Sequence, residues 1–177
     1  ANASLFWNVY NDKQEEILSY YPESPVGQQT FVENAAKART RGFELELIAV
    51  LLPDLTLRQS FGYLDASYVD GDFTYIVDGG EFQEPFSSQQ MRRAPKFQYS
   101  IFVDYIRELG PGLVNLHLDW RWIDQYQTSF PNIAIGEIPA NSRLNLLVGY
   151  TMPMPGNEDW TLRLEAFGRN LNNPSVL

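Results

Sequence analysis

The chain has 177 residues, with 13 basic and 22 acidic side chains, and therefore a net charge of −9 at pH 7. Hydrophobic residues make up 44% and aromatic residues 14%, a composition that excludes intrinsic disorder. The acidic excess argues against nucleic acid as a partner, because phosphate recognition needs a basic surface. The sequence has no cysteine and one histidine, His117, and shows no nucleophile-elbow or phosphate-loop motif. We therefore expect no enzyme activity, no catalytic residues, no cofactor and no metal.

Alternating apolar and polar residues predict seven β-strands and no helix. The clearest strand places Val114, Leu118 and Trp122 on one face and His117 and Asp119 on the other. The seven predicted strands lie, in chain order, around Leu5, Phe43, Leu55, Phe97, Val114, Leu144 and Leu162. The expected fold is all-β, an antiparallel up-and-down meander.

The connections between these strands alternate in length. The long ones cover residues 20–32, 70–92 and 128–137, whereas the short ones lie near residues 53–54, 109–112 and 153–159. In a meander, every second connection lies at the same end of the sheet. All long loops should therefore share one rim, as the extracellular loops of outer-membrane barrels do.

The two predicted faces differ in chemistry. Aromatic residues near the strand ends of the apolar face suggest an interfacial girdle, with ordinary core packing as the alternative: Tyr63, Tyr105, Trp120, Trp122 and Tyr150. The opposite face carries charges of both signs, which a water-filled lumen tolerates. The predicted lumen-facing wall residues are Glu44, Glu46, Arg58, His117, Asp119, Arg121 and Arg143, with Asp104, Arg163 and Glu165 on the same face.

Two sets of acidic residues could be interpreted as a catalytic pair or as a metal site. Glu44 and Glu46 could form an acid–base pair, but residues two apart on one strand more simply form a charge ladder, with Arg58 as the cross-strand partner. The acids Asp70, Asp72, Asp78 and Glu81 match four positions of a calcium loop. Tyr75 stands where that loop needs glycine, so we interpret the segment as a solvated acidic loop that could attract cations.

Several segments in this order resemble the C-terminal part of the transmembrane barrel of TonB-dependent outer-membrane receptors. They are residues 34–46 (NAAKARTRGFELE), 53–57 (PDLTL), 62–68 (GYLDASY), 93–96 (RAPK) and 168–174 (GRNLNNP). The resemblance implies a segment of a 22-stranded transmembrane β-barrel in the bacterial outer membrane. It also implies that residues 1–177 are the C-terminal portion of such a receptor, without its plug domain and last strand.

The resemblance further implies a non-enzymatic receptor that imports a scarce nutrient, most commonly a ferric siderophore. Its implied partners are outer-membrane lipid, the rest of the barrel and plug, TonB acting through the plug, and the nutrient itself. Aromatic loop residues could contact that ligand, or could instead pack the loops together. These candidates are Tyr20, Tyr21, Phe73, Tyr75, Phe82, Phe86 and Phe130.

Two other readings of the sequence stay open. A complete small outer-membrane barrel with a structural or adhesive role would fit the length, but it needs an even strand number and full pairing of its inward charges. A soluble β-sandwich that binds carbohydrate would also alternate apolar and polar residues. It would not need to sort its loops by length.

Overall fold

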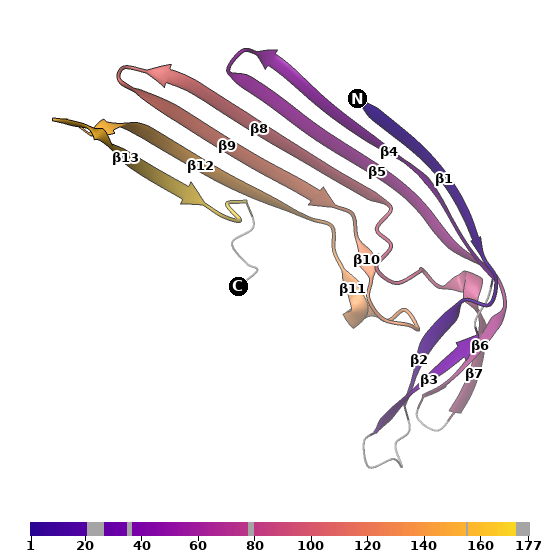
Figure 1. The fold of residues 1–177 in the computed structure, drawn as a ribbon. Helices are drawn as coiled ribbons and strands as arrows, with labels where there is room; N and C mark the ends of the chain where they lie inside the picture. Colours follow the sequence, from indigo (N-terminus) through magenta and orange to yellow (C-terminus); the bar gives the residue numbers. More distant parts are fainter. Residues whose placement is uncertain (21–26, 35–36, 78–79, 155, 173–177) are drawn as a thin grey trace.

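A computed structural model describes residues 1–20, 27–34, 37–77, 80–154 and 156–172. The main element is one curved seven-stranded sheet (Figure 1). Its strands, in order across the sheet, are β1 (Asn2–Tyr10), β4 (Lys37–Leu52), β5 (Leu55–Asp70), β8 (Phe97–Leu109), β9 (Gly112–Ile123), β12 (Asn141–Met154) and β13 (Asn157–Gly168). These are the seven predicted strands.

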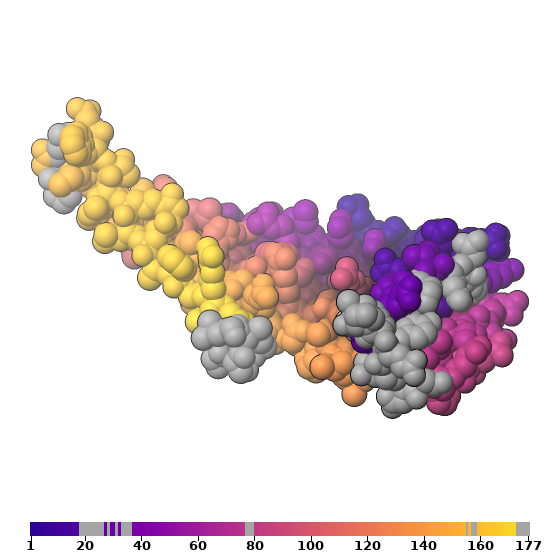
Figure 2. Space-filling view, turned by 90° about the horizontal axis from the view of Figure 1, so that it is seen from below, coloured from indigo at the N-terminus to yellow at the C-terminus, as the bar shows by residue number. Residues whose placement is uncertain are grey.

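Neighbouring strands of this sheet are antiparallel and follow the order of the chain, which confirms the predicted meander. β5 pairs with β8 over nine residues, Leu55 to Tyr63, close to the 9–11 residues that a tilted strand needs to cross a bilayer. In the described part of the chain, the sheet is a single layer with β1 and β13 at opposite edges (Figures 1 and 2). This arrangement is neither a two-layer sandwich nor a closed small barrel.

Each long connection contains a hairpin, and all three lie at the same end of the sheet (Figure 1). Each excursion forms its own two-stranded sheet: β2 (Gln14–Tyr20) with β3 (Gln28–Asn34), β6 (Asp72–Val77) with β7 (Gly80–Pro85), and β10 (Tyr126–Gln127) with β11 (Glu137–Ile138). Two three-residue 3₁₀ turns, η1 (Phe86–Ser88) and η2 (Ala134–Gly136), add to them. We call this end the outer rim.

Most apolar side chains of the sheet are not buried by protein. Leu5, Leu45 and Leu164 are 87%, 46% and 57% exposed. The buried apolar residues of the described chain gather instead at the outer rim, and they are Ile17, Ala38, Tyr68, Phe73, Phe86 and Phe130. The sheet therefore has an apolar face that lacks a covering layer of protein. No described helix is long and apolar enough to cross a membrane.

Residues after β13 continue along the edge of β12. β12 pairs with β13 only from Leu146 onward, and the segment 169–172 takes over beside Leu144. Leu171 N–H donates to the Leu144 carbonyl at 2.9 Å, and the Asn172 side chain accepts from Leu144 N–H at 2.7 Å. Leu171 and Asn172 thus supply the two hydrogen bonds to the Leu144 backbone that a paired strand residue would otherwise make.

Candidate functional site

The strand register separates the two predicted faces. On the apolar face, aromatic rings form a band at the outer end of β4, β5, β8 and β9, with ring centroids 5.3–6.4 Å apart: Phe43, Phe61, Tyr63, Phe97, Tyr99 and Trp120. Beyond this band the same face becomes polar, since Arg41 pairs with Asp65 at 2.7 Å. Tyr105 and Tyr150 lie toward the short turns. Aromatic residues thus lie near both ends of the apolar face, which is the distribution expected of an interfacial girdle.

The opposite face, here called the inner wall, carries the predicted charged residues. Glu44 accepts a hydrogen bond from Ser4 at 3.3 Å, and Glu46 accepts one from Asn2 at 3.4 Å. Both partners come from β1. The predicted pairing of Glu44 and Glu46 with Arg58 is wrong, because the register sets Arg58 opposite Ile48.

Arg58 instead reaches the strand on its other side. Its guanidinium pairs with Asp104 of β8, and His117 Nδ1 of β9 contacts the other oxygen of the same carboxylate. Asp104 is the least exposed of the three side chains, at 14%. His117 therefore belongs to a three-strand polar cluster with Asp104, rather than pairing with Asp119.

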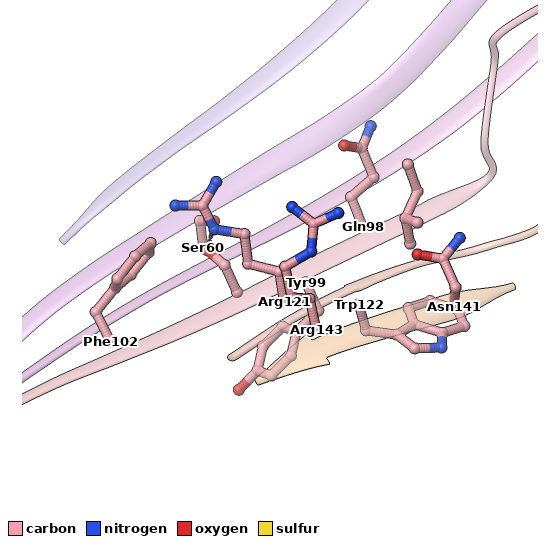
Figure 3. A pocket seen from close by; sticks show the side chains of 10 residues that line it. Ser60, Gln98, Tyr99, Phe102, Arg121, Trp122, Asn141 and Arg143 are labelled. Carbon is pink, nitrogen blue, oxygen red and sulfur yellow. Dashed lines mark hydrogen bonds between the residues drawn. The ribbon is translucent and has the colours of Figure 1, made fainter. Parts of the chain in front are cut away.

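A groove of about 430 Å³ crosses the inner wall near the outer end of β8, β9 and β12. Its lining includes Arg121 and Arg143, whose guanidinium groups lie on the same side of the sheet as the amide groups of Gln98 and Asn141 (Figure 3). Asp119, on the same wall, accepts hydrogen bonds from Arg121 Nε at 3.0 Å and from the Asn145 amide at 3.2 Å.

The inner wall becomes apolar toward the short turns, which the sequence analysis did not anticipate. Ile48, Val50 and Ile106 point to the same face as the charged residues, yet they are 66%, 70% and 55% exposed. The alternation of β4 fails here because both faces carry aliphatic residues from Leu47 to Leu52. On β8 and β13, however, charge returns at this level, where Glu108 and Arg163 lie on the inner wall.

At the outer rim, three of the candidate ligand-contacting rings pack against one another. Phe73 lies 4.7 Å from Phe130 and 5.0 Å from Phe86, and the Phe86 and Phe130 rings stack at 5.2 Å. These side chains are 1–3% exposed and also contact Tyr68. The second and third excursions are therefore held together by an aromatic cluster, and these three rings have no free face in this arrangement.

The remaining candidates differ in accessibility. Phe82 is 49% exposed and stacks on Tyr75 with centroids 5.6 Å apart. The Tyr75 hydroxyl donates to Glu84 at 2.9 Å, and this hydrogen bond raises the pKa of Tyr75. β2 includes Tyr20, whose side chain lies outside the described residues, as does the whole of Tyr21.

A buried carboxylate, that of Glu15, connects three segments of the rim. Its side chain is 2% exposed, pairs with Lys13 and with Arg92 at 2.9 Å, and accepts a hydrogen bond from the Tyr68 hydroxyl at 2.7 Å. Burial and the charge of Arg92 lower the pKa of Lys13. Burial raises the pKa of Tyr68 to about 12, against the opposing effect of Arg92. Sequence reasoning missed Glu15, because an acid in a surface connection gives no signal of burial.

Beside Glu15 lies a cleft with a volume of about 570 Å³. Lys13, Arg92 and Arg93 contribute positive charge to its lining, Glu15 and Glu16 contribute negative charge, and Val32 and Met91 add apolar surface. Asn132 fixes the neighbouring segment, since its backbone N–H donates to the Gln89 side chain at 2.7 Å. This cleft can offer ionic and apolar contacts to a ligand at the rim.

The acidic segment does not form a calcium loop in the described residues. Asp72 begins β6 and Glu81 lies in β7, so an extended hairpin replaces the compact turn that such a loop requires. Asp78 lies outside the described residues. Within the part of the chain that the structure describes, no three histidine or acidic side chains converge on a common point.

Comparison with known proteins agrees with this architecture. Residues 1–171 match the family described as "TonB dependent receptor-like, beta-barrel". Searches of curated proteins and of solved structures return no significant match. The match spans all seven strands of the sheet and the three outer hairpins. The chain therefore belongs to the TonB-dependent receptor β-barrel family, a family of bacterial outer-membrane receptors and transporters rather than of enzymes.

Proposed function

We propose that this chain supplies wall and rim to a receptor that binds a ferric siderophore at the cell surface and imports it with energy transmitted by TonB. The observation that carries the proposal is the asymmetry of the sheet. All three long connections are packed hairpins at one end, whereas the other end has short turns. A receptor needs such a built surface on the side from which its ligand arrives.

The rim cleft is the ligand-binding surface that we favour. Lys13, Arg92 and Arg93 of its lining attract acidic groups of a metal chelate, and Val32 and Met91 offer apolar contact to the rest of the ligand. The buried rings Phe73, Phe86 and Phe130 then have a supporting role, since they hold the hairpins that present these groups. The apolar face of the sheet contacts lipid, and the inner wall faces the rest of the barrel and its plug.

The proposal is tested with the full-length receptor in its source cell. A strain lacking the gene is compared with the wild type for uptake of ⁵⁵Fe bound to hydroxamate or catecholate siderophores under iron limitation. We expect deletion to abolish uptake of at least one chelate, and loss of TonB to have the same effect. Normal uptake of every chelate by the deletion strain would contradict the siderophore cargo, and uptake that survives loss of TonB would contradict the energy source.

A substitution then tests whether the rim cleft binds the ligand that is taken up. Arg93→Gln removes a cleft charge and is compared with Arg163→Gln, which removes a charge paired with Glu165 on β13, outside the cleft. We expect the first variant to raise the ligand concentration needed for half-maximal uptake by about tenfold, the scale of one charge-assisted hydrogen bond. Equal uptake by both variants would contradict this placement of the ligand.

A further inference from the structure

Two arginines face each other on the inner wall. The register of β9 and β12 sets Arg121 directly opposite Arg143, and Ser100 of β8 lies opposite Arg121 on the other side. Directly opposed residues on neighbouring strands have their Cβ atoms about 5 Å apart, and like charges at this spacing destabilise the sheet. A negatively charged group placed between the two guanidinium groups would offset this repulsion.

The acidic residues nearby compensate only part of this charge. Arg121 gives its Nε–H to Asp119 and stacks over the Phe102 ring, with its guanidinium carbon 5.1 Å from the ring centroid. This arrangement fixes the guanidinium and leaves its terminal nitrogens available. Arg143 has no ion pair or side-chain hydrogen bond with any described residue, whereas Arg58 and Arg163 on the same wall pair with Asp104 and Glu165.

The groove beside the two arginines contains several polar groups that can donate hydrogen bonds. The groove of about 430 Å³ is lined by both guanidinium groups, the hydroxyls of Ser60 and Ser100, and the amides of Gln98 and Asn141. No acidic residue lines it. Figure 3 shows these polar groups on one side of the sheet, with the rings of Tyr99 and Trp122 on the other. The groove is positively charged in a chain whose net charge is −9.

We propose that Arg121 and Arg143 form an oxyanion-binding site of the lumen wall, which takes a carboxylate or phosphate group of a solute passing along the barrel interior. Two guanidinium groups on adjacent strands can each donate a pair of parallel hydrogen bonds to such a group. The two amides add further donors, as does the Ser60–Ser100 pair, whose hydroxyls are hydrogen-bonded to each other at 2.6 Å. This inference rests on the proposed function in one respect, since it takes the inner wall to line the path of a solute.

The test uses the purified full-length receptor in detergent, with citrate and inorganic phosphate as separate probes in titration calorimetry. We expect the wild type to bind citrate, and both Arg143→Gln and Arg121→Gln to weaken that binding by about tenfold or more. Arg163→Gln is the matched control, because it removes the same charge from the same face but lies outside the groove. Arg143→Lys should weaken binding less than Arg143→Gln, because it keeps the charge but loses the planar fork.

The outcomes divide cleanly. Citrate or phosphate binding that is lost in both groove variants and kept in the control supports the site. Equal binding by the wild type and all four variants overturns it, as does a wild type that binds neither probe. In the latter case, a melting temperature lowered by Arg143→Gln and not by Arg163→Gln would assign the arginines to a carboxylate of the protein itself. Siderophore uptake in cells is measured independently, so the proposed function can survive the failure of this site.

Discussion

The Tyr68 hydroxyl donates a 2.7 Å hydrogen bond to the Glu15 carboxylate, although 53 positions separate the two residues in the chain. Tyr68 lies at the outer end of β5, and Glu15 lies in the first excursion. Arg92, which follows the second excursion, binds the other oxygen of the same carboxylate at 2.9 Å. One buried acid thus connects the wall with two of the three segments that form the rim.

Replacing this acid should loosen the rim without unfolding the wall. Glu15→Gln keeps the shape of the side chain but leaves Lys13 and Arg92 without their buried counter-charge, at a cost of about 2 kcal/mol. We expect amide hydrogen exchange in β2 and in residues 91–93 to accelerate about 30-fold, with β8 and β9 unchanged. Glu16→Gln is the control, because Glu16 is 63% exposed and its contact with Arg92 is 3.7 Å long. Equal acceleration in the two variants would refute the special role of Glu15.

The rim should also respond to alkaline pH. The pKa of Tyr68 is raised from its ordinary value of 10.0 to about 12, so folding favours the neutral phenol. The stabilisation from Tyr68 is fully present below pH 10 and is lost as the pH rises through 12. The tyrosinate difference spectrum between the wild type and Tyr68→Phe should show this late step. A tyrosine that titrates near pH 10 in that difference spectrum would show that Tyr68 is exposed.

Two adjacent leucines of β12 test which face meets lipid. Leu146 pairs with Leu118 on the apolar face, whereas Leu147 pairs with His117 on the inner wall. Leu146→Lys should cost about 2–4 kcal/mol of barrel stability if its side chain lies at the bilayer midplane. Leu147→Lys places the same amine in the lumen and should be tolerated. Folded receptor in outer membranes is measured by its heat-modifiable migration on gels, and similar losses from both variants would contradict this assignment of faces.

Two glycines of neighbouring strands differ in the space around them. A Cβ added to Gly42 of β4 would collide with the Tyr63 carbonyl and lie 2.8 Å from the Phe6 ring, whereas one added to Gly62 of β5 meets no atom within 4 Å. Gly42→Ala should therefore destabilise the receptor by about 1–3 kcal/mol through overpacking, and Gly62→Ala should not. Thermal unfolding of the two variants compares these costs directly. If Gly42→Ala is as stable as Gly62→Ala, then β1 and β5 can each shift away from β4 to make room for the added methyl group.

The wall of the sheet was predictable because apolar and polar residues alternate along most of each strand. This period of 2 holds in the middle of β8 and β9, whereas aliphatic residues such as Ile106 also lie on the inner wall toward the short turns. Partners across strands were less predictable, since they depend on register. Arg58 faces Ile48 on one side and reaches Asp104 on the other, a choice that residue spacing within a single strand does not encode.

The rim was harder to infer than the wall. The run of aromatic and β-branched residues from Phe73 to Ile76 would have indicated β6, but the acidic composition around it made this segment look like a loop. The burial of Glu15 had no local signal, because it arises from Tyr68 and Arg92, which are distant in sequence. Tertiary contacts of this kind appear only once the hairpins are placed together.

The separate pairing of the three hairpins has an evolutionary consequence. In the described chain, the ladder pairing of β2 with β3, of β6 with β7 and of β10 with β11 is separate from that of the seven-stranded sheet, so none of these hairpins sets the register of the wall strands. Lengthening the tip of one hairpin costs little loop-closure entropy and leaves the wall's hydrogen bonds intact. The hairpins of the rim can therefore diversify by insertion and deletion, while the seven-stranded wall stays fixed.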